Sequence, residues 1–223
     1  MNLSVIDLGL ISFKEAFYKQ IEIHRQVYLG KTSHTLILCQ HPHTITLGKL
    51  SRPSSILDYN FIKENNIDFM VGVNRGGDIT YHGPGQLVGY LIFDLRKLGR
   101  DLGGFLNKIE ETLIRTINSF GIAAQSRMGF RGAWINGRKI ASIGIGVEKW
   151  VSLHGLGLNV NTDLSFFKLI KPCGLDVQMT SMQEELGLYV MMEKVKEKIV
   201  EDIYDVFRVI AERYSLRQYS HCL

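Results

Sequence analysis

The chain has 223 residues, of which 45% are apolar and 22% charged, and its formal net charge at pH 7 is +4. This length and composition indicate a single globular catalytic domain over residues 1–223 and exclude a disordered chain. The mild positive charge does not indicate nucleic-acid binding, and no apolar run approaches the ~20 residues of a membrane span.

The start of the chain and its cysteines indicate a cytoplasmic protein. The first ten residues, MNLSVIDLGL, carry neither a basic region nor a small-residue cleavage site, so we expect no signal peptide. Cys39, Cys173 and Cys222 make an odd count without a close pair. This pattern favours a reducing compartment over a disulfide framework.

The first elements in the chain are a strand over residues 3–8 and a helix over 12–29. Ser12 is expected to cap the helix, with Glu15 completing a capping box. Phe13, Phe17 and Ile21 are expected to form its buried side.

Two further strands are expected over residues 35–39 and 44–47. Cys39, His41 and His43 would share one face of a straight strand, which would suit a soft metal ion. Pro42 breaks that strand, so a turn with surface histidines is the alternative, and we predict no metal site. A short helix over 59–65 and a strand over 68–73 follow.

A glycine-rich segment, RGGDITYHGPGQ, begins at Arg75 and precedes an apolar run over residues 87–93. Glycine is used where the backbone takes a positive φ or approaches another group closely. The segment therefore predicts either a double turn at a sheet edge or an exposed backbone wall of a binding site. It lacks the lysine and the spacing of a phosphate-binding P-loop.

The middle of the chain predicts a helix over residues 102–120 and then a β-hairpin. Asn136-Gly137 suits a type I′ turn. In a regular strand after this turn, Lys139 would share the apolar side with Ala141 and Ile143. Lys139 is then either directed outward at the strand end or partly desolvated beside a partner.

Another strand is expected over residues 150–161, where His154 is interpreted as a core histidine with satisfied hydrogen bonds. Cys173 lies between Pro172 and Gly174, a setting that exposes a thiol on a tight turn. Ser181 is expected to start a short helix, and a final amphipathic helix is expected over 190–214.

Three motifs in this order, RGGDITYHGPGQ, GAWINGRKIASIGIGVEKWVSLHGLGLNVN and KPCGL, resemble the lipoyl(octanoyl) transferases. The resemblance implies the α/β (α+β) fold of biotin and lipoate protein ligases, which is a mixed β-sheet flanked by helices. It also implies that Cys173 forms an acyl-thioester and that Lys139 lowers the pKa of this thiol. The acyl group is then expected to lie against three stretches, which are Arg75, Gly76, Gly77, Asp78, Ile79, Thr80, Tyr81 and His82; Ser142, Ile143 and Gly144; and Gly155, Leu156 and Gly157.

The same resemblance implies the partners. Octanoyl-acyl carrier protein is the expected donor, and the expected acceptors are lipoyl domains of 2-oxoacid dehydrogenase E2 subunits and the glycine cleavage H protein. No cofactor is implied. An ATP-dependent lipoate or biotin protein ligase and a non-catalytic lipoyl-domain binding protein are the alternatives.

Basic residues are the expected docking surface for an acidic carrier protein. The candidates are Lys49, Arg52, Arg96, Lys97 and Arg100, although a basic turn is commonly only a solvated face. The family more often has alanine where this chain has Gly157, which predicts a slightly roomier acyl site here.

Overall fold

A large mixed sheet dominates the computed structural model, which describes residues 2–171 and 177–215. The strand order is β11-β1-β2-β6-β10-β9-β8-β7. The strands comprise β1 (Asn2–Leu10), β2 (His34–Gln40), β6 (Gln86–Ile92), β7 (Gln125–Arg127), β8 (Phe130–Ile135), β9 (Arg138–Glu148), β10 (Val151–Asn159) and β11 (Ile210–Ser215). β11, β1 and β2 run parallel, whereas every pairing from β2 to β7 is antiparallel.

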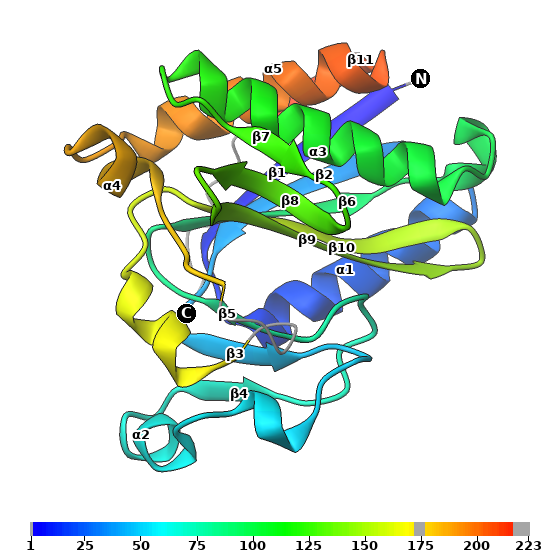
Figure 1. Cartoon of the computed structure of the whole chain (residues 1–223). Helices are drawn as coiled ribbons and strands as arrows, with labels where there is room; N and C mark the ends of the chain where they lie inside the picture. Colours follow the sequence, from blue (N-terminus) through cyan, green and yellow to red (C-terminus); the bar gives the residue numbers. More distant parts are fainter. Residues whose placement is uncertain (1, 172–176, 216–223) are drawn as a thin grey trace.

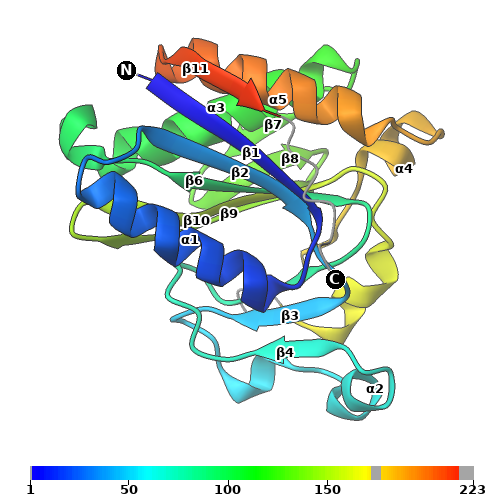
Figure 2. The same cartoon turned by 180° about the vertical axis from the view of Figure 1, so that it is seen from behind.

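Helices cover both faces of the large sheet, as expected for the α/β class (Figure 1). One face packs on α3 (Leu102–Ser119) and α5 (Met192–Phe207), and these elements share the largest apolar core. The other face packs on α1 (Phe13–Tyr28), which Figure 2 shows in front of the sheet. No helix in residues 2–171 and 177–215 is long and apolar enough to cross a membrane.

A small sheet lies on the α1 side of the molecule, below the large sheet in Figure 1. Its order is β4-β3-β5, with β3 (Thr44–Leu47) between β4 (Asp68–Met70) and β5 (Ile79–His82). It shares a separate apolar core with α2 (Tyr59–Glu64) and the 3₁₀ turn η3 (Leu164–Leu169). Further short elements are the 3₁₀ turns η1 (Pro53–Ser55) and η2 (Leu95–Leu98) and the helix α4 (Met182–Leu186).

Several sequence predictions are confirmed by this arrangement. Ser12 caps α1 by accepting the Glu15 N–H, and its hydroxyl donates to the Glu15 carboxylate at 2.6 Å. Asn136 and Gly137 have φ of 47° and 82°, and they join β8 to β9 through a two-residue turn. Two positive φ values are what a type I′ turn requires.

Other predictions are wrong. Ile21 is 42% exposed, and the buried side of α1 instead includes Gln20 and His24, so the apolar pattern of this helix misled the assignment. The final helix ends at Phe207 rather than at residue 214, and residues 210–215 add β11 beside β1. The strand expected over residues 68–73 ends at Met70.

His41 is fully buried, contrary to the expectation of a surface turn. Its Nδ1–H donates to the Ile11 carbonyl at 2.7 Å, so its Nε2 accepts from the Tyr90 hydroxyl, also at 2.7 Å. These bonds tie the end of β2 to the start of α1 and to β6. Burial lowers the pKa of His41 to about 4.

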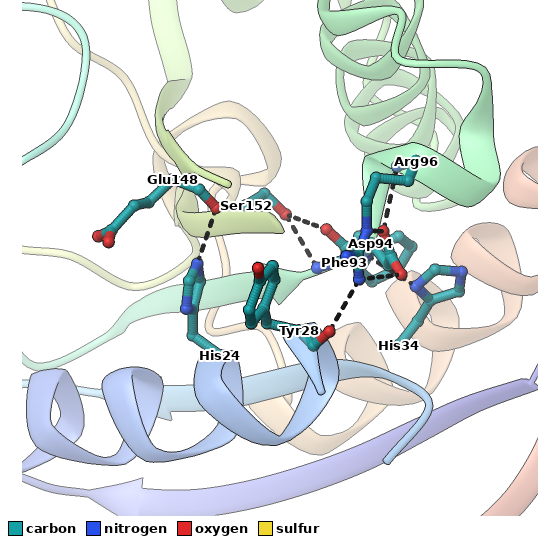
Figure 3. Close-up of polar contacts among 8 residues, drawn as sticks. All are labelled: His24, Tyr28, His34, Phe93, Asp94, Arg96, Glu148 and Ser152. Atoms are coloured by element: carbon teal, nitrogen blue, oxygen red, sulfur yellow. Dashed lines mark hydrogen bonds and ion pairs between the residues drawn. The ribbon is translucent and has the colours of Figure 1, made fainter. Parts of the chain in front are cut away.

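A second polar cluster lies at the C-terminal end of β6 and links it to α1 and β2 (Figure 3). Arg96 donates to both carboxylate oxygens of Asp94 and to the Tyr28 carbonyl at the end of α1. The Asp94 N–H donates to His34 Nδ1 at 3.0 Å. Burial and the nearby Lys97 lower the pKa of His34 to about 4.

We expect mild acid to destabilise the protein through His34 and His41. Both stay neutral in the folded state, whereas an unfolded histidine binds a proton below pH ~6.5. The free energy of unfolding should therefore fall as the pH drops from 6.5 toward 4, by on the order of 2 kcal/mol for each histidine between pH 7.5 and 5.

Urea unfolding at pH 7.5 and pH 5.0 measures this loss, and His41→Asn should reduce the pH dependence at the cost of lower stability at pH 7.5. Equal unfolding free energies of the unmodified protein at the two pH values would contradict the prediction.

Candidate active site

One cavity on the α1 face of the large sheet brings together the three predicted stretches. It lies where β5 and the segment before it cross β6, β9 and β10. Its lining includes Arg75, Gly76, Gly77, Asp78, Ile79, Thr80, His82, Lys139, Ser142, Ile143, Gly144, Gly155, Leu156 and Gly157.

Among the predicted site residues that the structure describes, Tyr81 alone does not join this lining. Tyr81 is fully buried on the other side of β5, where it stacks on Phe166 and its hydroxyl contacts His43 Nδ1 at 2.7 Å. Its place follows from strand alternation, because Thr80 and His82 face the cavity. Cys173 lies outside the described residues.

A β-bulge puts Lys139 on the cavity side of β9. Lys139 pairs with Trp134 and Ala141 pairs with Ala133, so Ile140 is an extra residue in β9. Ile140 and Ala141 both enter the core on the α3 side. The expected alternation is therefore wrong at Lys139, which joins Trp134 in the cavity lining.

Lys139 is half-buried, beside Trp134 and residues 178–180. Its ammonium lies 5.3 Å from the centre of the Trp134 ring. Its backbone N–H donates to the Gln178 carbonyl at 2.8 Å, and its carbonyl accepts the Thr180 N–H at 2.9 Å. Residues 177–180, which follow the segment carrying Cys173, thus run beside Lys139, and both Val177 and Met179 line the cavity.

The segment before β5 packs directly on two glycines of β9. The Gly76 N–H donates to the Ile145 carbonyl at 2.9 Å. A Cβ added at Gly146 would lie 2.1 Å from the Asn74 carbonyl oxygen, and one at Gly144 would lie 3.3 Å from that of Gly76. Glycine is therefore needed on β9 for close backbone approach.

Two polar side chains hold the cavity wall in place. Arg75 is 7% exposed, and its guanidinium donates to the Thr46 carbonyl, the Thr46 hydroxyl and the Gly76 carbonyl. Asp78 accepts from the Ser55 hydroxyl and from the Ile79 N–H. Both residues therefore position the backbone of the wall.

A chain of hydrogen bonds fixes the orientation of His82. The Gln86 Nε2 donates to Asn159 Oδ1 and to the Tyr81 carbonyl, so Gln86 Oε1 accepts from His82 Nδ1 at 2.7 Å. Burial and the neighbouring His41 lower the pKa of His82 to about 3, so the ring is neutral and its Nε2 is unprotonated. Asn159 Nδ2 extends the chain to the Thr180 carbonyl.

His154 lines the cavity, although the sequence favoured a satisfied core histidine at this position. It is 2% exposed, but its Nε2 has no hydrogen-bond partner within residues 2–171 and 177–215. Burial and Arg75 lower its pKa to about 4. Its φ of +61° is rare for a non-glycine residue and has no sequence signal beyond the adjacent Gly155.

Gly157 faces the Gln86 amide. A Cβ at this position would lie 3.3 Å from Gln86 Oε1, closer than most such contacts. Alanine would therefore press on the group that orients His82. Gly155 has another role, because its Cβ would lie 2.0 Å from the Gly89 carbonyl oxygen of β6.

The thiol of Cys39 is enclosed in the core away from the cavity lining. Its Sγ lies 3.6 Å from His41 Nε2, and burial raises the pKa of this thiol well above its usual range. A protonated, inaccessible thiol is a poor nucleophile. Within the part of the chain that the structure describes, no three His, Cys, Asp or Glu residues converge in a group that could hold a metal ion.

The basic docking candidates divide into two groups. The Lys49 N–H donates to the Arg75 carbonyl, and Arg52 precedes η1, which contacts Asp78 through Ser55. These two residues adjoin the cavity wall. Arg96 is paired with Asp94 at the C-terminal end of β6, Lys97 lines a separate pocket and Arg100 lies over Trp150.

Comparison with solved structures agrees with the fold. Lipoate-protein ligase A bound with ATP superposes with a TM-score of 0.80 at 14% identity, covering 98% of this chain and 90% of the other. The biotin protein ligase of Aquifex aeolicus superposes with a TM-score of 0.54 at 12% identity, covering 93% and 70%. At such low identity the likeness establishes the fold alone.

Sequence comparison establishes the family. The lipoyl protein ligase A/B catalytic domain matches residues 13–204. The octanoyltransferase of Geotalea uraniireducens is 43% identical over 198 residues, covering 88% of this chain and 89% of the relative. That of Solibacter usitatus is 39% identical over 206 residues, covering 92% and 93%. The chain therefore belongs to the lipoyl protein ligase A/B catalytic-domain family and, within it, to the octanoyltransferases.

Proposed function

We propose that this enzyme moves an octanoyl group from octanoyl-acyl carrier protein to the lysine of lipoyl domains through an acyl-thioester on Cys173. The observation that carries the proposal is the position of Lys139. It stands in the lining of the cavity, and its backbone is bonded to residues 178 and 180, a few positions after Cys173.

The first half-reaction is an exchange of thioesters. A free cysteine is largely protonated at neutral pH, so the thiol needs a base or a neighbouring positive charge to act as a nucleophile. In the proposal Lys139 accepts the thiol proton, and the Cys173 thiolate attacks the thioester carbonyl. The tetrahedral intermediate then collapses, and the phosphopantetheine thiolate leaves with the proton that Lys139 returns.

The second half-reaction is aminolysis. The amine of the acceptor lysine attacks the acyl-thioester, an amide bond forms, and the Cys173 thiolate leaves. The attacking nitrogen loses a proton, which the thiolate or Lys139 accepts. Neither half-reaction consumes ATP, because a thioester is already activated for acyl transfer.

The cavity lining supports this use. Gly144, Gly155 and Gly157 line the cavity without side chains, and Phe13 and Val88 add apolar surface to it. The Gly76 N–H is bonded to Ile145, so a different donor must stabilise the oxyanion of the tetrahedral intermediate. Lys49 and Arg52 are the charges best placed to meet an acidic carrier protein beside the cavity.

An ATP-dependent lipoate ligase is the second candidate, because lipoate-protein ligase A bound with ATP shares this fold. A ligase activates a free acid as an adenylate and needs no cysteine nucleophile. A non-catalytic lipoyl-domain binder would form no covalent adduct at all.

We expect octanoyl-acyl carrier protein without ATP to add one octanoyl group to the pure protein, as measured by intact mass. Cys173→Ser should abolish the thioester, whereas the Cys39→Ser/Cys222→Ser double variant should still form it, because Cys39 is sealed in the core. Octanoylation of a lipoyl domain from free octanoate and ATP, with no adduct on the enzyme, would favour the ligase, and loss of the adduct in the folded double variant would contradict the assignment to Cys173.

We expect Lys139→Arg to lower the acylation rate by ~10²-fold or more, the scale of general acid–base catalysis. Arginine keeps the positive charge but does not release its proton at working pH. Arg138→Lys is the matched control, because Arg138 pairs with Glu184 and Glu185 outside the cavity lining. The acylation rate is measured by single-turnover mixing. A near-native rate for Lys139→Arg would show that Lys139 contributes only its positive charge and transfers no proton.

We expect Gly76→Ala to slow catalysis by at least ~10-fold while changing the free energy of unfolding by less than ~0.5 kcal/mol. The nearest atom to the added methyl, Ile145 O, lies 3.5 Å away, so the fold accommodates the methyl at a residue that lines the cavity. Gly146→Ala is the contrast, because its methyl clashes with Asn74 O and should destabilise the fold by about 1–3 kcal/mol. Thermal melts and rates on both variants decide, and equal destabilisation would remove the support for Gly76 as a wall of the site.

A further inference from the structure

The floor of the cavity is built from two rows of residues that lie side by side across β6, β10 and β9. The rows follow from the strand register and consist of Val88, Gly157 and Ser142 in the first and Tyr90, Gly155 and Gly144 in the second. Successive rows on one face are two residues, or about 7 Å, apart. The number of rows therefore gives the distance between two points along the cavity floor.

His154 departs from the alternation of β10 just beyond the second row. A regular strand would direct its ring to the same face as Leu156, in the core under α3 and α5. The φ of +61° instead accompanies a ring on the α1 face, stacked on Phe17 at 5.6 Å and on Phe13 at 6.5 Å. The His154 N–H, bonded to Gln20 Oε1 at 2.9 Å, holds this turn of the backbone.

The ring stands across the inner end of the cavity. Its Cδ2 lies 3.5 Å from the Cβ position of Gly146, which is two residues beyond Gly144 on β9. The ring therefore lies over Gly146, at the level of a third row. The buried His154 lines the cavity at a positive φ, and its Nε2 has no hydrogen-bond partner within residues 2–171 and 177–215.

Lys139 marks the other end. Its Cε lies 2.8 Å from the Cβ position of Gly132, which pairs with Ser142 of the first row. The first and third rows lie about 14 Å apart along the strands. The reacting carbonyl belongs near Lys139 if the proposed function holds.

We propose that the His154 ring is the inner stop of the acyl site and sets the longest chain that the enzyme transfers. An extended eight-carbon chain advances roughly 8–9 Å at ~1.2 Å per bond. Its terminal methyl needs ~4 Å more for van der Waals contact with the ring, which brings the total to about 12–13 Å. A ten-carbon chain needs about 15 Å and meets the ring.

The inference rests on the proposed acyl transfer and identifies a specificity-determining residue for it. His154→Gly tests it best, since glycine accepts a positive φ and leaves the place of the ring empty. Single-turnover acylation with hexanoyl-, octanoyl-, decanoyl- and dodecanoyl-acyl carrier protein is followed by intact mass. We expect the decanoyl-to-octanoyl rate ratio to rise at least ~10-fold, the lower end of what one methylene contributes in an apolar pocket.

His154→Asn is the second variant, because asparagine also tolerates a positive φ and is smaller than histidine. It replaces His154→Gly if that protein does not fold. Leu153→Ala is the matched control, since Leu153 is buried next to His154 but does not line the cavity. This control should lose stability and keep the chain-length ratio of the unmodified enzyme.

An unchanged ratio in a folded His154 variant would overturn the inference, as would the same rise in Leu153→Ala. Failure of the underlying function looks different, because the unmodified enzyme would then accept no acyl group of any length from the carrier protein.

Discussion

The close contact between residues 74–77 and β9 is the constraint on which the site depends. The Asn74 and Gly76 carbonyls approach Gly146 and Gly144 so closely that a side chain at Gly146 would displace the backbone. The Gly76 N–H adds a hydrogen bond to Ile145. This contact fastens the small sheet to the large one and leaves a cavity between them. The glycines of the two motifs thus act together. Gly76 belongs to the cavity wall, and Gly144 and Gly146 allow the backbone of this wall to approach β9 closely.

Much of the fold follows from local sequence signals. These signals depend only on residues close together in the sequence, so pattern alone identified three features. They are the turn at Asn136-Gly137, the cap at Ser12 and the helix α3. β11 was missed because its register depends on β1, some two hundred residues earlier, and its residues continue an amphipathic helix pattern. Phe13 and Phe17 of α1 were assigned correctly to the buried side, but Ile21 was not, because Gln20 and His24 are buried through partners on β10 and β9.

In the candidate site, too, some features follow from local sequence signals and others depend on distant contacts. The glycine-rich stretches and Lys139 are visible in the sequence, and the structure brings them into one cavity. The position of Lys139 on that cavity depends on the bulge at Ile140, which no alternation rule could supply. His154 is the clearest omission. Its backbone conformation is stabilised by Gln20, which lies far away in the sequence on α1. A histidine in an apolar strand pattern indicates only an ordinary core residue.

The fold alone does not separate an octanoyltransferase from a ligase, because lipoate-protein ligase A superposes over nearly the whole chain at 14% identity. The reactions of the two enzymes differ in the step that activates the acyl group. A ligase must place a nucleotide beside a free acid, whereas thioester exchange needs a nucleophilic thiol and a group that takes its proton. The Cys39 thiol is sealed in the core with a raised pKa. Cys173 follows the part of the chain that contacts Ser55 and precedes the part that contacts Lys139. The choice between the two chemistries therefore depends on this one segment and its lysine rather than on the sheet that carries them.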